Sequence, residues 1–451
     1  MKAPVSLAPR AHVSPILQTA PSGLDSAVFY GVLGLLLFGP LAFGAVEPWS
    51  IFLLEAASGL IFVIWVYYQV RSAELRIVGN PLFAPMSAFA VLICIQLLSG
   101  HSSYRYETTS SGLLYCAYGI VCFLVVQSFR TTTQVRVLTK VLCGYGFAVA
   151  MFALLQGIDP NGALYWIRTP RLGGWMYGPY VNHNHYAGLM EMLIPVPLVA
   201  ALMEVADRPN RVMAAVAASV MASTVFLSGS RGGMLALSVE MAICAAILIR
   251  RRNSRTTAVT LGVFLVLGVG LLAWLGGGKL TERLASIDSE ARTEVSGGTR
   301  IQINRDGLKM FKLKPVLGWG LGTFPTVYPR YRTFYTNLFI NEAHDDYLQL
   351  LVEMGGLGFL VMLWFLAITY RRAVGKLSGW SKNPNGAVSL AAMLGITGIL
   401  VHSFVDFNLQ IPANAALFYV LCVVAAMEPC FGPLRLPRMR RRSSLPNELS
   451  I

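Results

Sequence analysis

Hydrophobic runs of similar length alternate with short polar segments along most of the chain. About twelve runs can be drawn, each close to the ~20 residues that an α-helix needs to cross ~30 Å of hydrocarbon. They lie near residues 27–46, 51–70, 82–98, 112–128, 137–157, 187–203, 212–228, 233–249, 258–276, 347–370, 387–405 and 411–427. This pattern predicts an all-α polytopic membrane protein.

The first run, residues 27–46, has two interpretations. It can be a cleaved signal sequence, because Gly44 and Ala45 are small, or a retained membrane span. A long polar lead precedes it and many further runs follow, which favours a retained span. We therefore expect a disordered cytoplasmic tail over residues 1–26, a transmembrane domain over residues 27–430 and a basic cytoplasmic tail over residues 431–451.

Arginines and lysines are concentrated in every second loop. One set of loops, with the C-terminal tail, carries Arg71, Arg76, Arg130, Arg136, Arg208, Arg211, Arg250, Arg251, Arg252, Arg255, Arg371, Arg372, Lys376, Arg435, Arg438, Arg440, Arg441 and Arg442. The short loops of the other set hold little beyond Arg105, Arg168, Arg171 and Arg231. The positive-inside rule therefore predicts that both termini are cytoplasmic.

Composition supports the membrane and argues against a nucleic-acid partner. The chain is 55% hydrophobic and 13% charged, whereas soluble domains are roughly 25% charged. Its net charge of +14 lies largely in short loops between spans, where it indicates topology rather than nucleic-acid binding. None of the seven cysteines forms a CxxC pair or lies in the longest polar segment, so no disulfide framework is expected.

The longest polar segment, residues 277–346, separates the ninth and tenth runs and should face away from the cytoplasm. Loops of this length are uncommon unless they carry function. Residues 299–311 are compatible with a helix packed through Ile301, Ile303, Leu308 and Phe311, and Pro315 should end it. The glycine-rich stretch 318–324 can be a nucleotide loop or a close-packed turn, and the absence of a preceding strand favours the turn.

Arginines near this outer face suit a diphosphate, because a guanidinium group can bind phosphate oxygens through two hydrogen bonds. Arg231 lies in a tight glycine-rich turn between two spans, and Arg300 and Arg305 lie in the long loop. The alternatives are a snorkelling arginine in the turn and solvated loop cations.

His344 is the candidate general base, because a histidine that is neutral near pH 7 can accept a proton from a hydroxyl. Asp345, Asp346 and Tyr347 follow it, where a helix begins. The aspartates can cap that helix, and one of them can orient the imidazole. The alternative is an interfacial histidine satisfied by hydrogen bonds.

His183 and His185 precede the sixth run and can be read as metal ligands or as contacts to a sugar or headgroup. No matched carboxylate or cysteine set accompanies them, so we expect no metal. His402 and Asp406 are four residues apart, which predicts a structural pair on one helical face, with Asp406 also a candidate for substrate binding. Four glutamates in or near the spans, Glu55, Glu191, Glu240 and Glu353, keep a proton-coupled transporter as an alternative.

Several of these motifs together resemble the O-antigen ligase and polymerase superfamily of bacterial membrane glycosyltransferases. The resemblance runs from about Gly173 to the last run. It rests on the 228–233 stretch SGSRGG, on Gly298-Thr299-Arg300 with the glycine-rich stretch 318–324, and on the 343–348 stretch AHDDYL. The 182–185 stretch NHNH and residues 402–412 are also similar to bacterial members. The family often has Asn directly after its histidine, where this chain has Asp345.

The resemblance implies a twelve-span, GT-C-like protein of the bacterial inner membrane, with a large, partly helical periplasmic loop and its core at about residues 173–370. It implies transfer of a glycan from undecaprenyl diphosphate to an acceptor hydroxyl, without metal or cofactor. Arg231 and Arg300 would hold the donor diphosphate and His344 would activate the acceptor. His183, His185, Arg305, Asp345, Asp346, Tyr347 and Asp406 are the further candidate substrate contacts.

We therefore expect an O-antigen ligase-type glycosyltransferase that acts on lipid A core or a related polysaccharide at the periplasmic face. The alternatives within the superfamily are an O-antigen or exopolysaccharide polymerase and a protein-O-glycosylating enzyme. The alternative from another class is a twelve-span transporter or flippase.

Overall fold

A computed structural model describes residues 23–72, 77–129, 131–158, 161–169, 175–249, 297–337 and 339–427. Within these ranges the secondary structure is helical, with no strands beyond two isolated bridges, Leu164 with Arg168 and Tyr177 with Tyr180. The ninth predicted run, the stretch 277–296 of the long loop and almost all of the two predicted tails lie outside the described residues.

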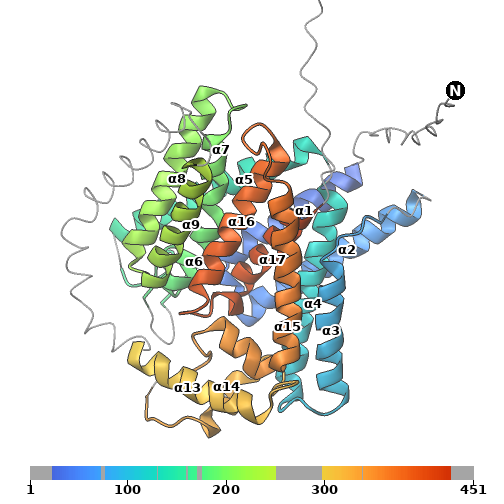
Figure 1. Cartoon of the computed structure of the whole chain (residues 1–451), viewed down its shortest axis with the longest axis vertical. Helices are drawn as coiled ribbons and strands as arrows, with labels where there is room; N and C mark the ends of the chain where they lie inside the picture. The colour runs from blue at the N-terminus through green and yellow to red at the C-terminus, as the bar shows by residue number, and fades with distance from the viewer. Residues whose placement is uncertain are drawn as a thin grey trace, which may run out of the picture.

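The described helices form one bundle whose long axis is vertical in Figure 1. They are α1 (Gly23–Leu41), η1 (Phe43–Ala45), α2 (Pro48–Arg71), α3 (Phe83–Leu98), α4 (Arg105–Ser128), α5 (Thr132–Ile158), α6 (His183–Leu193), α7 (Pro195–Leu202), α8 (Arg208–Ser228), α9 (Arg231–Ile249), α13 (Gly297–Leu313), α14 (Phe324–Val327), η2 (Tyr328–Arg330), α15 (Asp346–Gly375), α16 (Pro384–His402), η3 (Asn408–Gln410) and α17 (Pro412–Ala426).

Eleven of the predicted hydrophobic runs correspond to these helices. Eight spans among the described residues are long and apolar enough to cross a membrane, and α1, α3 and α17 are shorter apolar helices. The described part of the chain is therefore helical, and its long apolar helices are those expected of a polytopic membrane protein. The sixth run is divided, because Pro195 occupies the first turn of α7 directly after α6.

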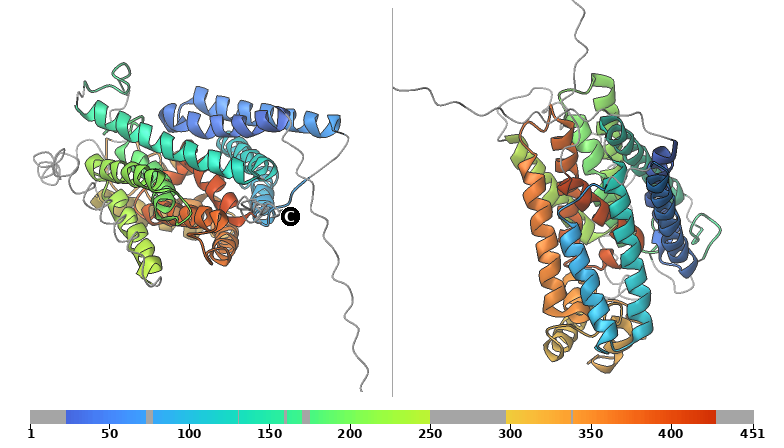
Figure 2. Two further views of the ribbon diagram at one scale, coloured as in Figure 1. Left: turned by 90° about the horizontal axis from the view of Figure 1, so that it is seen from above. Right: turned by 90° about the vertical axis from the view of Figure 1, so that its right-hand side faces the viewer.

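The α6–α7 unit forms the centre of the bundle. Almost every residue of both helices is buried, and α8, α16 and α17 pack around them. Small residues allow this close approach: a Cβ atom on Gly395 of α16 would lie only 2.9 Å from the Cα of Met192. By contrast, α1 and α2 pack against each other along one side of the molecule (Figure 2).

The described part of the long loop covers one end of the bundle, where α13 and α14 lie beside the start of α15 (Figure 1). The predicted helix is confirmed, but its predicted packing face is partly wrong. Ile303 is fully buried, whereas Ile301 is 56% and Leu308 45% exposed. The inner face instead uses Asp306, which accepts hydrogen bonds from Thr333, together with the small Gly307, which packs on Leu348.

The glycine-rich stretch 318–324 is a close-packed turn against a kink in α15. Gly355 interrupts the helix with φ 65°, and a Cβ there would lie 2.3 Å from the carbonyl oxygen of Val316. The buried Glu353 carboxylate accepts hydrogen bonds from the backbone N–H groups of Gly322, at 2.8 Å, and Phe324, at 3.1 Å. These contacts fix the loop to the tenth predicted span.

Candidate functional site

Residues 403–407, which link α16 to η3, form the segment around which several predicted site residues gather. The start of α15 is fastened to this segment by Asp346. The backbone N–H of Asp346 donates to Ser403 O at 3.0 Å, and its carboxylate accepts from Ser403 Oγ at 2.8 Å. It also accepts from Leu409 N and Gln410 Nε2, each at 3.1 Å. Asp346 is buried and holds the two segments together.

His344 lies immediately before this junction, in a left-handed backbone conformation with φ 56°. Its half-buried imidazole meets the ring of Phe407 edge-on, with centroids 4.8 Å apart. Asp345 accepts from the backbone N–H groups of Tyr347 and Leu348, both at 3.0 Å, and so caps α15. Burial raises the pKa of the Asp345 carboxyl, although these two hydrogen bonds oppose the shift.

Arg300, near the start of α13, contacts the same segment from the loop side. Its Nη1 donates to Val405 O at 2.6 Å and lies 3.7 Å from Asp406 Oδ2. Burial by itself would raise the pKa of Asp406, but the charge of Arg300, followed by three nearby histidines, outweighs it and lowers the pKa to about 2. Asp406 is therefore a buried anion next to a guanidinium group.

His185, the third residue of α6, approaches Asp406 from the bundle side. Its Nε2 lies 3.9 Å from Asp406 Oδ1, and its ring meets Phe407 edge-on at 4.8 Å. One phenylalanine therefore contacts both His185 and His344.

His183, in contrast, has a different environment from His185. Its Nδ1 lies 2.9 Å from Ser228 O, and its ring stacks on Trp175 with centroids 4.6 Å apart. The two histidines of the motif thus face different neighbours. No group of three or more His, Cys, Asp or Glu residues that could hold a metal ion occurs in the part of the chain that the structure describes.

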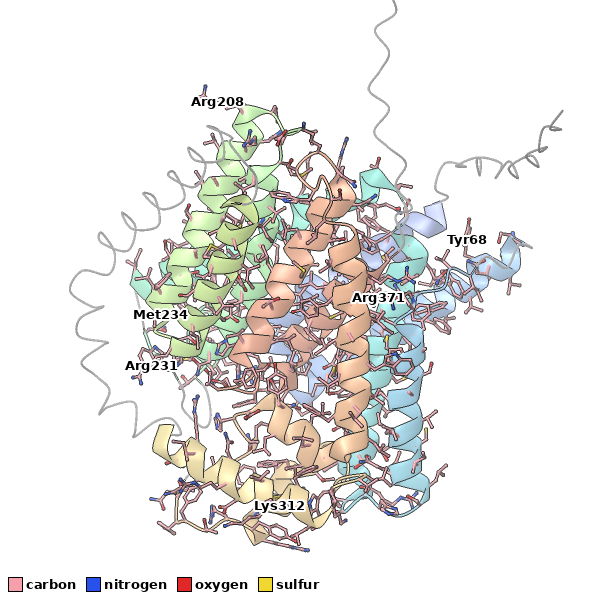
Figure 3. The ribbon with its side chains drawn as sticks, in the orientation of Figure 1. Tyr68, Arg208, Arg231, Met234, Lys312 and Arg371 are labelled. Carbon is pink, nitrogen blue, oxygen red and sulfur yellow. The ribbon has the colours of Figure 1, made fainter. Side chains whose placement is uncertain are left out.

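Arg231 begins α9 after a tight turn. Gly229 ends α8 in the left-handed conformation, with φ 78°, and Ser230 Oγ accepts from Gly233 N at 3.1 Å. The Arg231 side chain is exposed, and Figure 3 shows it at the end of the bundle that faces α13.

Two buried residues within the bundle hold this turn in place. His402 Nδ1 lies 2.9 Å from Glu191 Oε1, and both side chains are almost fully buried. A Cβ atom on Gly232 would lie 2.5 Å from the His402 ring and 2.9 Å from Val405 Cγ2. Only glycine permits this approach, so the Arg231 turn and Arg300 both meet residue 405.

The predicted pairing of His402 with Asp406 is wrong. α16 ends at His402, so Asp406 lies beyond the helix, close to Arg300 and His185, while His402 pairs with Glu191. The sequence reasoning also missed Phe407 and Val405. The intramembrane position of Glu191 was a signal, because buried carboxylates usually have a partner or a function.

Other predicted contacts lie in different surroundings. The Tyr347 hydroxyl donates to Leu400 O at 2.6 Å, and its ring packs on Phe404 with centroids 4.4 Å apart. Arg305 lines a cavity of about 450 Å³ on α13 with Lys309 and Lys312. Glu240, in α9, is fully buried and its carboxylate has no hydrogen-bond partner among the described residues.

Comparison with known proteins found one matching family. Residues 216–363 match the family model described as O-Antigen ligase, which confirms the resemblance noted in the sequence. The matched part runs from α8 into α15 and includes Arg231, Arg300 and His344. No curated protein matches the chain.

Proposed function

We propose that this chain, whose residues 216–363 match the O-Antigen ligase family model, transfers a glycan from undecaprenyl diphosphate to an acceptor hydroxyl. The transfer takes place at the periplasmic face of the inner membrane, in a GT-C-like bundle of about twelve spans. Lipid A core is the proposed acceptor. A polymerase of the same superfamily would use the same donor site with a polysaccharide acceptor.

One observation carries this proposal: residues distant in sequence meet around residues 403–407. Arg300 contacts Val405 and Asp406, His344 and His185 both contact Phe407, and the Arg231 turn packs on Val405 through Gly232. A set of cations and imidazoles at one end of an otherwise apolar bundle fits a lipid-borne anion. Two of the buried glutamates favour a transporter less, because Glu191 pairs with His402 and Glu353 accepts hydrogen bonds from backbone N–H groups. Glu240, whose buried carboxylate has no hydrogen-bond partner among the described residues, is the residue on which the transporter alternative rests.

In this proposal Arg300 and Arg231 bind the donor diphosphate. When the glycosidic bond to the diphosphate breaks, negative charge grows on the leaving oxygen. Guanidinium groups that are already in place stabilise that charge without reorganisation, and electrostatic stabilisation of this kind accounts for most of the rate enhancement in many enzymes. Asp406 holds Arg300 beside the segment, since its carboxylate is ionised and lies 3.7 Å from Arg300 Nη1.

His344 is the proposed base. The acceptor hydroxyl gives its proton to an imidazole nitrogen, and the acceptor oxygen attacks the anomeric carbon as the bond to the diphosphate oxygen breaks. The undecaprenyl diphosphate leaves with the bonding electron pair, and the anomeric centre is inverted. Contact with Phe407 fixes the ring, and the Asp406 carboxylate stabilises the imidazolium that forms.

The experiment is a transfer assay with the purified protein in lipid vesicles, a polyprenyl-diphosphate-linked glycan and an acceptor lipid. His344→Ala should lower the initial rate by roughly 10²–10⁴-fold, the usual contribution of general acid–base catalysis. His101→Ala is the matched control, because this exposed histidine lies in the α3–α4 loop and contacts Ser99. Equal transfer rates for the two variants would show that His344 is not the general base.

A further inference from the structure

A second cavity lies at the end of the bundle opposite the 403–407 segment. It has a volume of about 500 Å³ and lies between α5, α7, α16 and α17, with Leu36 of α1 at its edge. In Figure 3, Arg208 marks this end, next to the loop that lines the cavity, and Arg231 marks the other. We call it the α5–α17 cavity. Small-molecule sites usually measure roughly 300–1,000 Å³.

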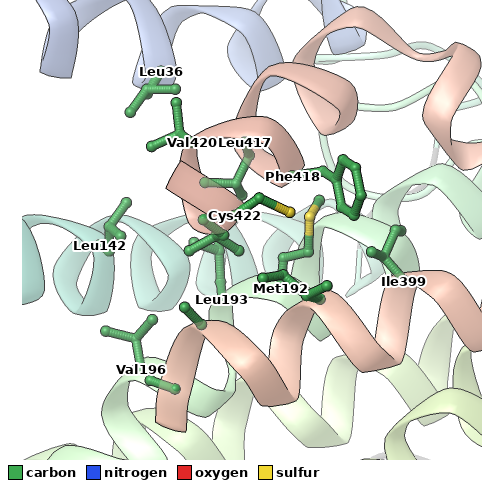
Figure 4. Packing of buried hydrophobic residues seen from close by; sticks show 14 of the residues in the cluster. Leu36, Leu142, Met192, Leu193, Val196, Ile399, Leu417, Phe418, Val420 and Cys422 are labelled. Carbon is green, nitrogen blue, oxygen red and sulfur yellow. The ribbon is translucent and has the colours of Figure 1, made fainter. Parts of the chain in front are cut away.

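The body of this cavity is apolar. Figure 4 shows Leu36, Leu142, Val196 and Leu417, from four different helices, around the same space. The further apolar lining residues include Leu138, Val199, Ala391, Val420, Leu421 and Val424. A space of this kind favours a hydrocarbon chain over water, because water would find no hydrogen-bond partner on these walls.

The polar lining residues come from α5 and from the start of α8, and they include the uncharged Thr139 and Asn210. The charged lining residues are Arg136 and Lys140 of α5 and Asp207 at the start of α8. Arg136 and Lys140 are four residues apart and exposed, so they extend from one face of the helix. The Asp207 carboxylate accepts a hydrogen bond from Asn210. Two cations against one engaged carboxylate make the mouth of the cavity positive.

We propose that the α5–α17 cavity binds one acyl chain of an anionic phospholipid, whose headgroup phosphate lies on Arg136 and Lys140. The charge distribution argues for this occupant, since basic pockets between transmembrane helices on the cytoplasmic side bind anionic headgroups. The positive-inside pattern assigns this end to the cytoplasmic leaflet. A zwitterionic lipid would bring an ammonium group toward the same two cations.

The glycan donor is a poorer occupant. The arginines assigned to its diphosphate, Arg231 and Arg300, belong to the opposite end of the bundle. The lipid site also stands apart from the proposed transfer reaction, because no residue of the 403–407 segment lines the α5–α17 cavity. Its test therefore requires no activity measurement.

The test uses the full-length protein in phosphatidylcholine vesicles that contain a trace of phosphatidylglycerol with a photoreactive group on the acyl chain. Crosslinks should map to α5, α7 and α17. Arg136→Gln and Lys140→Gln should each lower the labelling at limiting lipid roughly fivefold, the effect of losing one cation near an anionic headgroup. Arg71→Gln and Arg371→Gln are matched controls, because both arginines are exposed and neither lines the cavity.

A second variant tests the apolar part. Ala391→Phe places a ring in the cavity and should abolish the crosslinks, whereas Ala90→Phe, at an exposed position of α3, should preserve them. The charge variants keep the test decisive if Ala391→Phe does not fold. Equal labelling in the Arg136→Gln and Arg71→Gln proteins would overturn the proposal. So would equal labelling by photoreactive phosphatidylcholine, or displacement of the probe by undecaprenyl phosphate but not by phosphatidylglycerol.

Discussion

At the scale of single residues, the site depends on a buried anion and two neighbours, and the three residues come from three parts of the chain. Asp406 lies near Arg300 of α13 and His185 of α6, and it follows the end of α16. The sequence could nominate each of these residues by its chemistry. The sequence could not predict which of these residues contact each other, because the partner of Asp406 depends on where α16 ends and on how distant segments pack.

The first prediction concerns the charge of Asp406. Its pKa of about 2 is below the ~3.9 of an unfolded aspartate, so its contribution to stability is complete above ~3.9 and is lost as the pH falls through about 2. The infrared difference spectrum between the wild type and Asp406→Asn should therefore show an ionised carboxylate throughout pH 5–8. A protonated carboxyl band at pH 5 would contradict this.

At the scale of elements, glycines decide how closely segments approach. The sequence placed the helices well, because hydrophobic length is a local property. Lys314-Pro315 also marked the end of α13 within a residue or so. It did not predict the buried face of α13, because Asp306 and Gly307 occupy inner positions that a simple apolar pattern assigns to Ile301 and Leu308.

The second prediction tests the contact beneath Arg231. Gly232→Ala puts a Cβ 2.5 Å from the His402 ring, so the turn must move. We expect a clear loss of transfer rate, of the order of tenfold or more, because misplacement of a positioning group by about 1 Å can cost 10²-fold. Gly144→Ala in α5 is the control, since a Cβ there meets nothing within 4 Å. Similar rates for both variants would show that the turn tolerates displacement.

The third prediction concerns the α15 kink. Gly355 has φ 65°, and its missing Cβ leaves room for Val316 O, so Gly355→Ala should cost about 1–3 kcal/mol of stability. The thermal midpoint of the purified protein should fall accordingly. Gly375→Ala, at the end of the same helix and with open space around it, should leave the midpoint nearly unchanged. An unchanged midpoint for Gly355→Ala would mean that the kink relaxes without cost.

At the scale of the whole molecule, the charge asymmetry of the loops predicts which end of the bundle faces each side of the membrane. Arg208 and Lys312 lie at opposite ends in Figure 3. We predict that Lys312→Cys reacts with a membrane-impermeant thiol reagent added to spheroplasts, and that Arg208→Cys reacts only after lysis. Both variants belong in a background without the native cysteines. The reverse labelling would place the proposed site in the cytoplasm.

The central claim is that Arg231 and Arg300 bind the donor diphosphate while His344 carries out proton transfer beside them. The most direct measurement is donor binding and transfer in parallel for Arg231→Lys, Arg300→Lys and His344→Ala. All three should lose transfer, but only the lysine variants should bind the lipid-diphosphate donor more weakly, because lysine cannot form the two-pronged contact. Normal donor binding and transfer in Arg300→Lys, or loss of donor binding in His344→Ala alone, would contradict the account.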